Sequence, residues 1–323
     1  MSRTAVHRRG DEPAPRRAHR WKRWLGIGFT VLVLGLVGWA AHKVRWPEVL
    51  AALAAYPAST LAAAGLAAAA AHLFYTVYDV LGAAWAGHRL PIRRVMQVSF
   101  TSYTFNLNLG TLVGAVAMRA RMYARLGLES ADIGRVVAFS MVSNWLGYAF
   151  LAGLVFSAGA IELPAEWALS EAALRALGGA LILATAGYLA WCGLARRRRS
   201  FSVRGHVLTL PPLRIALAQL AASCAHWLAT AGILYLLLGE RVAYPEVLAT
   251  FLVAAIAGGV AHVPAGLGVL EAVCVALLSP QVPQHGVIAA LLAFRAVYHW
   301  LPLLLAIGLY VLIESRPKRV ATA

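Results

Sequence analysis

Two short glycine-rich stretches decide the fold of this chain: NLNLGTLVG at residues 106–114 and VPAGLGVLE at residues 263–271. Each interrupts an otherwise apolar run, the first over residues 95–118 and the second over residues 246–278. In lipid an unpaired backbone group is costly, so a broken helix occurs at membrane depth only where protein or water covers the break. The sequence therefore predicts two covered breaks, although the glycines and Pro264 could instead simply kink two continuous helices.

The surrounding composition places the chain in a membrane. Hydrophobic residues make up 61% and charged residues 13% of the sequence, against about half and about a quarter in soluble domains. The apolar runs are continuous, without the alternation of a barrel strand, so we expect an all-α polytopic membrane protein. Candidate full spans of about 20 residues or more are 24–42, 58–87, 134–159, 172–194, 213–238 and 286–313, and residues 43–57 read as a helix in the interface.

The net charge of +16 is distributed unevenly along the chain. Basic residues cluster at 1–23, 88–94, 119–135, 195–214 and after 313, while the other connections are poor in Lys and Arg and carry most of the Glu residues. This is the positive-inside asymmetry of membrane proteins, so we expect cytoplasmic termini and no nucleic-acid partner. Basic clusters flank the first interrupted segment and acidic connections flank the second. Each is therefore expected to be a re-entrant helical hairpin, the two entering from opposite faces.

An internal repeat supports this arrangement. Residues recur at an offset of 154, and at 155 after one residue of slippage, in the pairs His72 and His226, Pro91 and Pro245, Gly114 and Gly268, and Trp145 and Trp300. Inverted repeats are a common construction in transporters. The predicted organisation is a disordered basic cytoplasmic tail at 1–23, a single transmembrane domain at 24–314 with inverted repeats at about 58–160 and 213–313, and a cytoplasmic tail at 315–323.

Ionisable residues inside apolar sequence indicate the candidate site. A charge there costs about 2.5–3.5 kcal/mol on insertion scales, so partners are expected. We expect Glu271 to pair with Arg295, either as a gate or only as a clip between hairpin and span. Asp79 lies close to the end of its span, where it could reach water or bond Tyr75 or Tyr78.

Two arginines follow the first hairpin, and an arginine fork pairs bidentately with phosphate. We expect Arg119 and Arg121 to engage a lipid phosphate at a basic mouth, with ordinary membrane anchoring as the alternative. Half-helices starting near Thr111 and Leu267 would direct their positive ends toward mid-membrane. The histidines 72, 226, 262 and 299 are either packed core residues or a proton relay. The residues predicted to bind or gate the substrate are Arg119, Arg121, Asn108, Gly110, Gly114, His262, Pro264, Gly266, Gly268, Glu271 and Arg295.

Motifs for catalysis are not found in the sequence. It has no HExxH, P-loop or GxSxG pattern, and Cys192, Cys224 and Cys274 lie in apolar runs without a CxxC pair. We therefore expect no catalytic residues, metal or other cofactor, and no direct coupling to ATP.

The hairpin sequences resemble those of the lysylphosphatidylglycerol synthase transmembrane-region family. The likeness covers residues 25–314 and is strongest in residues 108–114 running into Arg119, and in residues 263–271 followed by Arg295. It implies movement of aminoacylated or other anionic phospholipid between leaflets, with Glu271, Arg295 and Arg119 as matched polar positions. Many relatives carry an acidic residue where this chain has Ala115, which argues against a charge-coupled role for the first hairpin. The soluble aminoacyl-transferase domain of fused relatives is not in this sequence, so we do not expect lipid synthesis.

These observations predict a flippase-like translocator of the bacterial inner membrane, with membrane phospholipids as its partners. Two other functions stay open: a membrane scaffold for a lipid-metabolising enzyme, and a small-solute exporter. A homo-oligomer and a lipid-synthesising partner enzyme are both compatible with the sequence.

Overall fold

The computed structural model describes residues 45–88, 90–164, 170–195, 200–203, 206–261 and 268–315, with isolated positions between 28 and 42. The chain divides into two compact units, Met1–Val44 and Arg45–Ala323, and the second contains the elements below. Several predictions lie outside the described residues. They are the tail at 1–23, most of the span at 24–42, the chain end after residue 315, and the site residues His262, Pro264 and Gly266.

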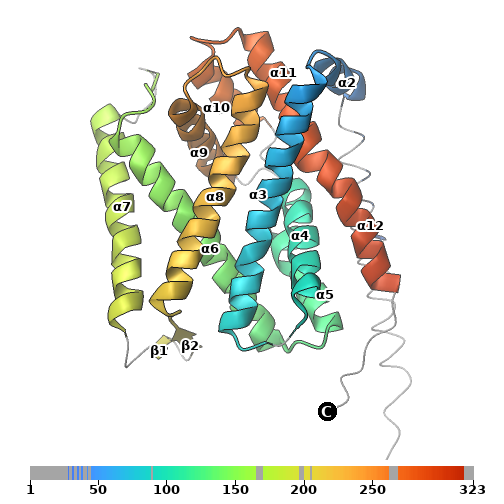
Figure 1. Ribbon diagram of the computed structural model, residues 1–323, viewed down its shortest axis with the longest axis vertical. Coiled ribbons are helices and arrows are strands. Elements are labelled where there is room, and N and C mark those ends of the chain that lie inside the picture. The colour runs from blue at the N-terminus through green and yellow to red at the C-terminus, as the bar shows by residue number, and fades with distance from the viewer. Residues whose placement is uncertain are drawn as a thin grey trace, which may run out of the picture. The chain divides into compact units, whose positions relative to one another are not determined.

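Helices make up nearly all of the described part of this second unit (Figure 1). In chain order the elements are α2 (Trp46–Ala54), α3 (Ala58–Trp85), α4 (Ile92–Leu109), the π-helix η1 (Leu112–Met118), α5 (Arg119–Arg125), α6 (Ser130–Ser157), α7 (Glu171–Leu194), β1 (Ser200–Val203), β2 (His206–Thr209), α8 (Leu213–Leu237), α9 (Tyr244–Ala261), α10 (Val269–Leu278), α11 (Gln284–Phe294), the π-helix η3 (Arg295–Trp300) and α12 (Leu301–Ser315).

Five segments among the described residues are long and apolar enough to cross a membrane. They are Ala58–Trp85, Ser130–Ser157, Glu171–Leu194, Leu213–Leu237 and the continuous run Gln284–Ser315. These agree with five of the six predicted spans to within a few residues, and the sixth, 24–42, is the one outside the described range. The prediction of an all-α polytopic membrane protein is therefore confirmed.

The first interrupted segment folds back on itself. Helix α4 ends at Gly110, whose φ of 85° is a conformation that glycine adopts without strain. The chain then returns along α4 as η1 and α5. A Cβ built on Gly114 would lie 2.0 Å from the Asn106 backbone nitrogen, so only glycine allows the two legs to approach this closely.

The second interrupted segment pairs α9 with α10 in the same way. Gly268 precedes α10 with a φ of 83°, and a Cβ there would meet nothing within 4 Å. Gly114 and Gly268, which match in the sequence repeat, therefore serve different purposes: close packing in the first hairpin and a turn in the second. In Figure 1, α4 and α5 lie in the lower part of the bundle and α9 and α10 in the upper part. The two hairpins thus enter from opposite ends.

Helices α3 and α8, which begin the two predicted repeats, lie side by side in the centre of the bundle (Figure 1). Small residues bring their neighbours close, as is usual between membrane helices. A Cβ on Gly147 of α6 would lie 2.3 Å from the Ser223 hydroxyl oxygen of α8. Strands β1 and β2 pair antiparallel in the connection between α7 and α8, a feature that the sequence analysis did not anticipate.

We expect Gly114→Ala to lower the apparent thermal unfolding midpoint of the purified protein in detergent. The added methyl would meet backbone atoms of α4, which cannot move aside as a side-chain end could, and overpacking of this kind costs about 1–3 kcal/mol. Gly134→Ala, at an exposed position of α6, is the control, because a Cβ there meets nothing within 4 Å and alanine favours a helix by about 0.5–1 kcal/mol. Equal midpoints for the two variants would contradict the tight hairpin.

Candidate functional site

A cavity of about 500 Å³ lies where the two hairpins meet. The break of the first hairpin lines it, as do the end of α9 and the first turn of α10. These lining residues are Leu109, Gly110, Thr111, Leu112, Gly258, Gly259 and Leu270. The returning legs of both hairpins therefore begin at this cavity.

A chain of hydrogen-bonding side chains, whose direction is fixed at His226, lines part of the cavity. His226 Nδ1 lies 2.9 Å from the Ala71 carbonyl oxygen, which can only accept, so Nδ1 carries the proton. In the neutral ring, Nε2 then accepts from the Tyr103 hydroxyl at 3.2 Å. The Tyr103 oxygen in turn lies 2.7 Å from the Tyr298 hydroxyl, which lies 3.2 Å from the Thr230 hydroxyl. The cavity also has apolar lining residues, which include Trp227, Phe251 and Phe294.

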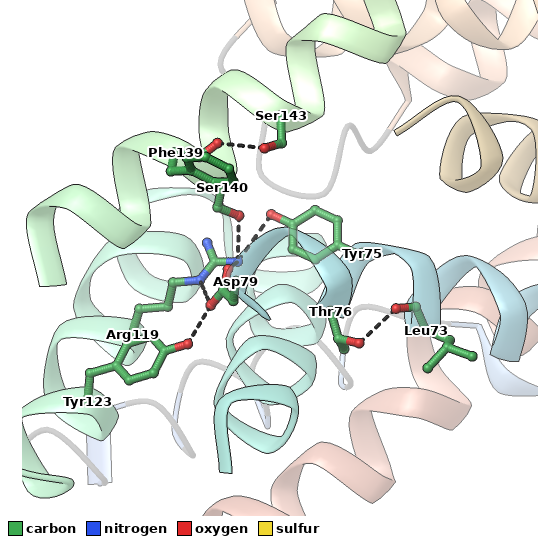
Figure 2. Close-up of polar contacts among 9 residues, drawn as sticks. All are labelled: Leu73, Tyr75, Thr76, Asp79, Arg119, Tyr123, Phe139, Ser140 and Ser143. Carbon is green, nitrogen blue, oxygen red and sulfur yellow. Dashed lines mark hydrogen bonds and ion pairs between the residues drawn. The ribbon is translucent and has the colours of Figure 1, made fainter. Parts of the chain in front are cut away.

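A second polar cluster is buried beside the first hairpin (Figure 2). Arg119 and Asp79 both have fully buried side chains, and each of two guanidinium nitrogens lies 3.1 Å from a different carboxylate oxygen. The Tyr123 hydroxyl donates to Asp79 at 2.8 Å, and Arg119 also donates to the Ser140 hydroxyl at 3.2 Å and to the Tyr75 hydroxyl at 3.4 Å. The cluster ties α5 to α3 and α6.

This cluster corrects two predictions. Arg119 does not lie at an open basic mouth, because its guanidinium has no exposed surface and is paired with Asp79. Asp79 does not reach water at the end of its span, and its partners are Arg119 and Tyr123 instead of Tyr75 or Tyr78. The bundle encloses both residues, although Arg119 is the first residue of α5 and Asp79 lies in the last two turns of α3.

Arg121 is also paired within the protein. Arg121 and Arg125 both contact the carboxylate of Glu314 near the end of α12, and Arg125 donates to the Glu314 backbone carbonyl at 2.9 Å. These contacts join the end of the first hairpin to the last span. The expected phosphate contact of Arg121 is therefore replaced here by a carboxylate.

The predicted Glu271–Arg295 pair is confirmed. Arg295 Nε lies 2.6 Å from Glu271 Oε1 and Nη2 lies 3.0 Å from Oε2, a bidentate arrangement. Glu271 Oε2 also accepts from the Gly268 backbone amide at 2.9 Å and so caps the start of α10. The Glu271 side chain is 30% exposed and that of Arg295 is 4% exposed, so this pair is more accessible than the sealed Asp79–Arg119 pair.

The remaining predicted residues in the described part of the first hairpin are Asn108, Gly110 and Gly114. Asn108 donates to the carbonyl oxygens of Thr104 at 2.8 Å and His299 at 3.2 Å, and so holds the first hairpin against η3. Gly110 lines the cavity, whereas Gly114 packs the hairpin legs together. Tyr103 and Thr230 were not predicted as site residues, because their hydroxyls lie within runs that read as ordinary buried helix.

Breaking the buried pair on one side should destabilise the protein strongly. Asp79→Asn leaves the Arg119 charge buried without its counter-charge, which costs about 3–5 kcal/mol, so we expect a large fall in the unfolding midpoint. The double variant Asp79→Asn/Arg119→Gln removes both charges and should recover much of the loss. A midpoint that falls further in the double variant than in Asp79→Asn would contradict a coupled pair.

Comparison with known proteins agrees with this architecture. The profile of the family described as the lysylphosphatidylglycerol synthase transmembrane region matches residues 23–306. Inner membrane protein YbhN of Escherichia coli is 43% identical over 96% of both chains, and a protein of Synechocystis is 29% identical over 91% of this chain and 93% of its own length. The phosphatidylglycerol lysyltransferase of Staphylococcus haemolyticus is 25% identical over 73% of this chain but only 27% of that enzyme. The spans and the similarity to YbhN support a bacterial inner-membrane protein. The chain belongs to the lysylphosphatidylglycerol synthase transmembrane-region family.

Proposed function

We propose that this protein is a flippase-like translocator that moves an anionic or aminoacylated phospholipid across the inner membrane without ATP. The observation that carries the proposal is the cavity of about 500 Å³ at the meeting point of two opposed hairpins. In this proposal both termini and the entrance of the first hairpin face the cytoplasm, and residues 58–160 and 213–313 act as inverted repeats. Alternating access in such repeats is commonly a movement of one repeat against the other around a fixed site.

The chemistry of the cavity suits an amphiphile. Hydroxyls, the imidazoles of His226 and His299, and the Asn106 amide are among the lining groups, and such groups can bond the oxygens of a headgroup. Aromatic and aliphatic side chains line the rest, where the upper part of an acyl chain would be buried favourably. A small polar solute would leave this apolar lining in contact with water, so the cavity favours lipid over the solute-exporter alternative.

The charge pairs set how far the hairpins can move. Asp79–Arg119 and the Arg121–Glu314 contact hold the first hairpin to α3 and α12. Glu271–Arg295 is the ion pair that holds the returning leg of the second hairpin to η3, and it is partly exposed. The second hairpin is therefore the one that we assign to gating, with Glu271 and Arg295 as the gating residues. The first hairpin serves as the fixed half of the site.

The related lysyltransferases connect this region with lipid chemistry. Their name assigns to them the lysylation of phosphatidylglycerol, and this chain corresponds to about a quarter of such an enzyme. A membrane region fused to a lipid-modifying enzyme is well placed to handle its lipid, which supports a lipid substrate for the stand-alone chain.

Filling the cavity should stop translocation. Gly259 lines the cavity and a Cβ there meets nothing within 4 Å, so Gly259→Leu can occupy the space without a backbone clash. In proteoliposomes containing phosphatidylglycerol with a fluorescent acyl chain, quenched by a membrane-impermeant reductant, we expect the translocation rate to fall at least about tenfold, equal to about 1.4 kcal/mol.

The matched control is Gly232→Leu on α8, where a Cβ also meets nothing within 4 Å and which does not line the cavity. It should translocate at the wild-type rate. Wild-type protein that translocates no faster than empty liposomes would overturn the proposed function and favour the scaffold alternative. Gly259→Leu protein as fast as the wild type would remove the cavity from the path.

A further inference from the structure

A groove of about 390 Å³ lies between α3, α4 and α12. A layer of aromatic side chains separates it from the central cavity. Its floor is made by small residues of α3, Gly65, Ala68 and Ala69, and its sides by apolar residues of α4 and α12. Its polar lining residues are His72, Thr76 and Gln97. Thr76 donates to the Leu73 carbonyl oxygen at 2.7 Å, and Gln97 accepts from Arg94 at 3.4 Å.

His72 differs from the other two because one of its polar atoms is both buried and unpartnered. Its Nδ1 lies 2.9 Å from the Ala68 carbonyl oxygen and therefore carries the proton. Nε2 is then a hydrogen-bond acceptor in the neutral ring. It has no partner among the described residues although the side chain is only 4% exposed. A buried acceptor without a partner is unfavourable, so a donor from outside the protein would be stabilised here.

The matching residue of the second repeat has no such unused nitrogen. His226 occupies the equivalent position at an offset of 154. Its Nδ1 donates to the Ala71 carbonyl oxygen and its Nε2 accepts from Tyr103. Both nitrogens of His226 are thus satisfied within the protein, whereas Nε2 of His72, a residue that lines the groove, has no partner among the described residues.

Only one layer of rings separates this groove from the central cavity. The His72 ring lies with its centroid 4.9 Å from that of Tyr298 and 5.6 Å from that of Tyr103. Tyr103 and Tyr298 line the central cavity, and His72 lines the groove. Rotation of these side chains would join the two spaces.

We propose that the groove between α3, α4 and α12 is the lateral portal that holds the acyl chain of the transported phospholipid, and that His72 Nε2 accepts a hydrogen bond from a headgroup O–H or N–H at its inner end. This inference rests on the proposed function and names where the lipid enters and what its headgroup must carry. His72 is a specificity-determining residue in this scheme, since a headgroup without a donor leaves Nε2 unpaired.

The rim of the groove fits a hydrocarbon chain. Leu73, Leu301 and Leu305 line it and are 51%, 56% and 61% exposed, so an acyl chain can pass between groove and bilayer without crossing polar surface. A Cβ built on Gly65 would meet nothing within 4 Å, which shows open space above the floor.

The headgroup requirement is tested with two lipids of equal charge. Phosphatidylglycerol carries hydroxyl donors, whereas phosphatidylmethanol is an anionic phosphodiester without any. We expect wild-type protein in proteoliposomes to translocate phosphatidylglycerol about threefold to tenfold faster, the effect of one hydrogen bond. His72→Phe should abolish this preference, and His72→Gln, whose amide oxygen can accept, should retain it. The ratio of the two rates does not depend on how much of each variant folds.

Equal rates for the two lipids in the wild type, or an unchanged preference in His72→Phe, would overturn the role of His72 while leaving translocation itself established. Translocation of neither lipid would instead contradict the proposed function.

The portal is tested by filling it. Gly65→Leu should slow both lipids at least about tenfold, while Gly187→Leu on exposed α7, where a Cβ also meets nothing within 4 Å, should leave both rates unchanged. A Gly65→Leu protein that translocates lipid at the wild-type rate would contradict the portal. That result would be expected if the groove instead holds a second copy of the chain.

Discussion

The first hairpin depends on a guanidinium that is fully shielded from solvent. Arg119 is tolerated inside an apolar bundle because Asp79 faces two of its nitrogens and because Ser140 and Tyr75 accept from it. A buried charge without these partners would be strongly destabilising. Since Arg119 opens α5 and Asp79 lies on α3, the pair fixes the height of the returning leg against α3. The position of the hairpin tip, and hence of the cavity, follows from that height.

The second hairpin also carries a paired charge on its returning leg, but the sign of that charge is reversed. Here the returning leg carries the acid, Glu271, and the following span carries the base, Arg295. The two pairs differ in exposure, however. Both side chains of the first pair are fully buried, whereas the Glu271 side chain is 30% exposed. An exposed pair can exchange partners at lower cost than a buried one, which is the physical reason for treating one hairpin as fixed and the other as mobile.

The fold could be predicted to the extent that the bilayer itself dictates it. Charges and unpaired backbone groups are costly in the hydrocarbon core, and this cost sets the helix lengths, the charge asymmetry and the need to cover the two glycine-rich breaks. These features were enough to predict five spans and both hairpins. The Glu271–Arg295 pair was also predictable, because both residues lie deep in apolar sequence and only a nearby opposite charge could compensate them.

The errors have a common cause. Asp79 and Arg119 lie near basic connections, so each could be assigned to water from sequence alone, and nothing in the spacing of 40 residues shows that α3 and α5 pack together. Tyr103 and Thr230 read as ordinary buried helix because a helix pattern does not reveal where a hydroxyl points. The β1–β2 pair lies in a connection that was interpreted only through its charge.

The lining of the central cavity has a consequence for an anionic substrate. Among the described residues that line it there is no Lys, Arg, Asp or Glu, so a phosphate entering it finds no fixed counter-charge in the wall. The nearest arrangement that already holds an anion is the start of α10, where a carboxylate oxygen of Glu271 accepts from the Gly268 amide and the same carboxylate meets the Arg295 fork. A phosphate has the same geometry toward an amide and a guanidinium as a carboxylate does. In the proposed function the headgroup would therefore compete with Glu271 for these donors, and displacement of Glu271 would release the tie between α10 and η3. Binding of the substrate and movement of the second hairpin would then be a single event, which needs no nucleotide to drive it.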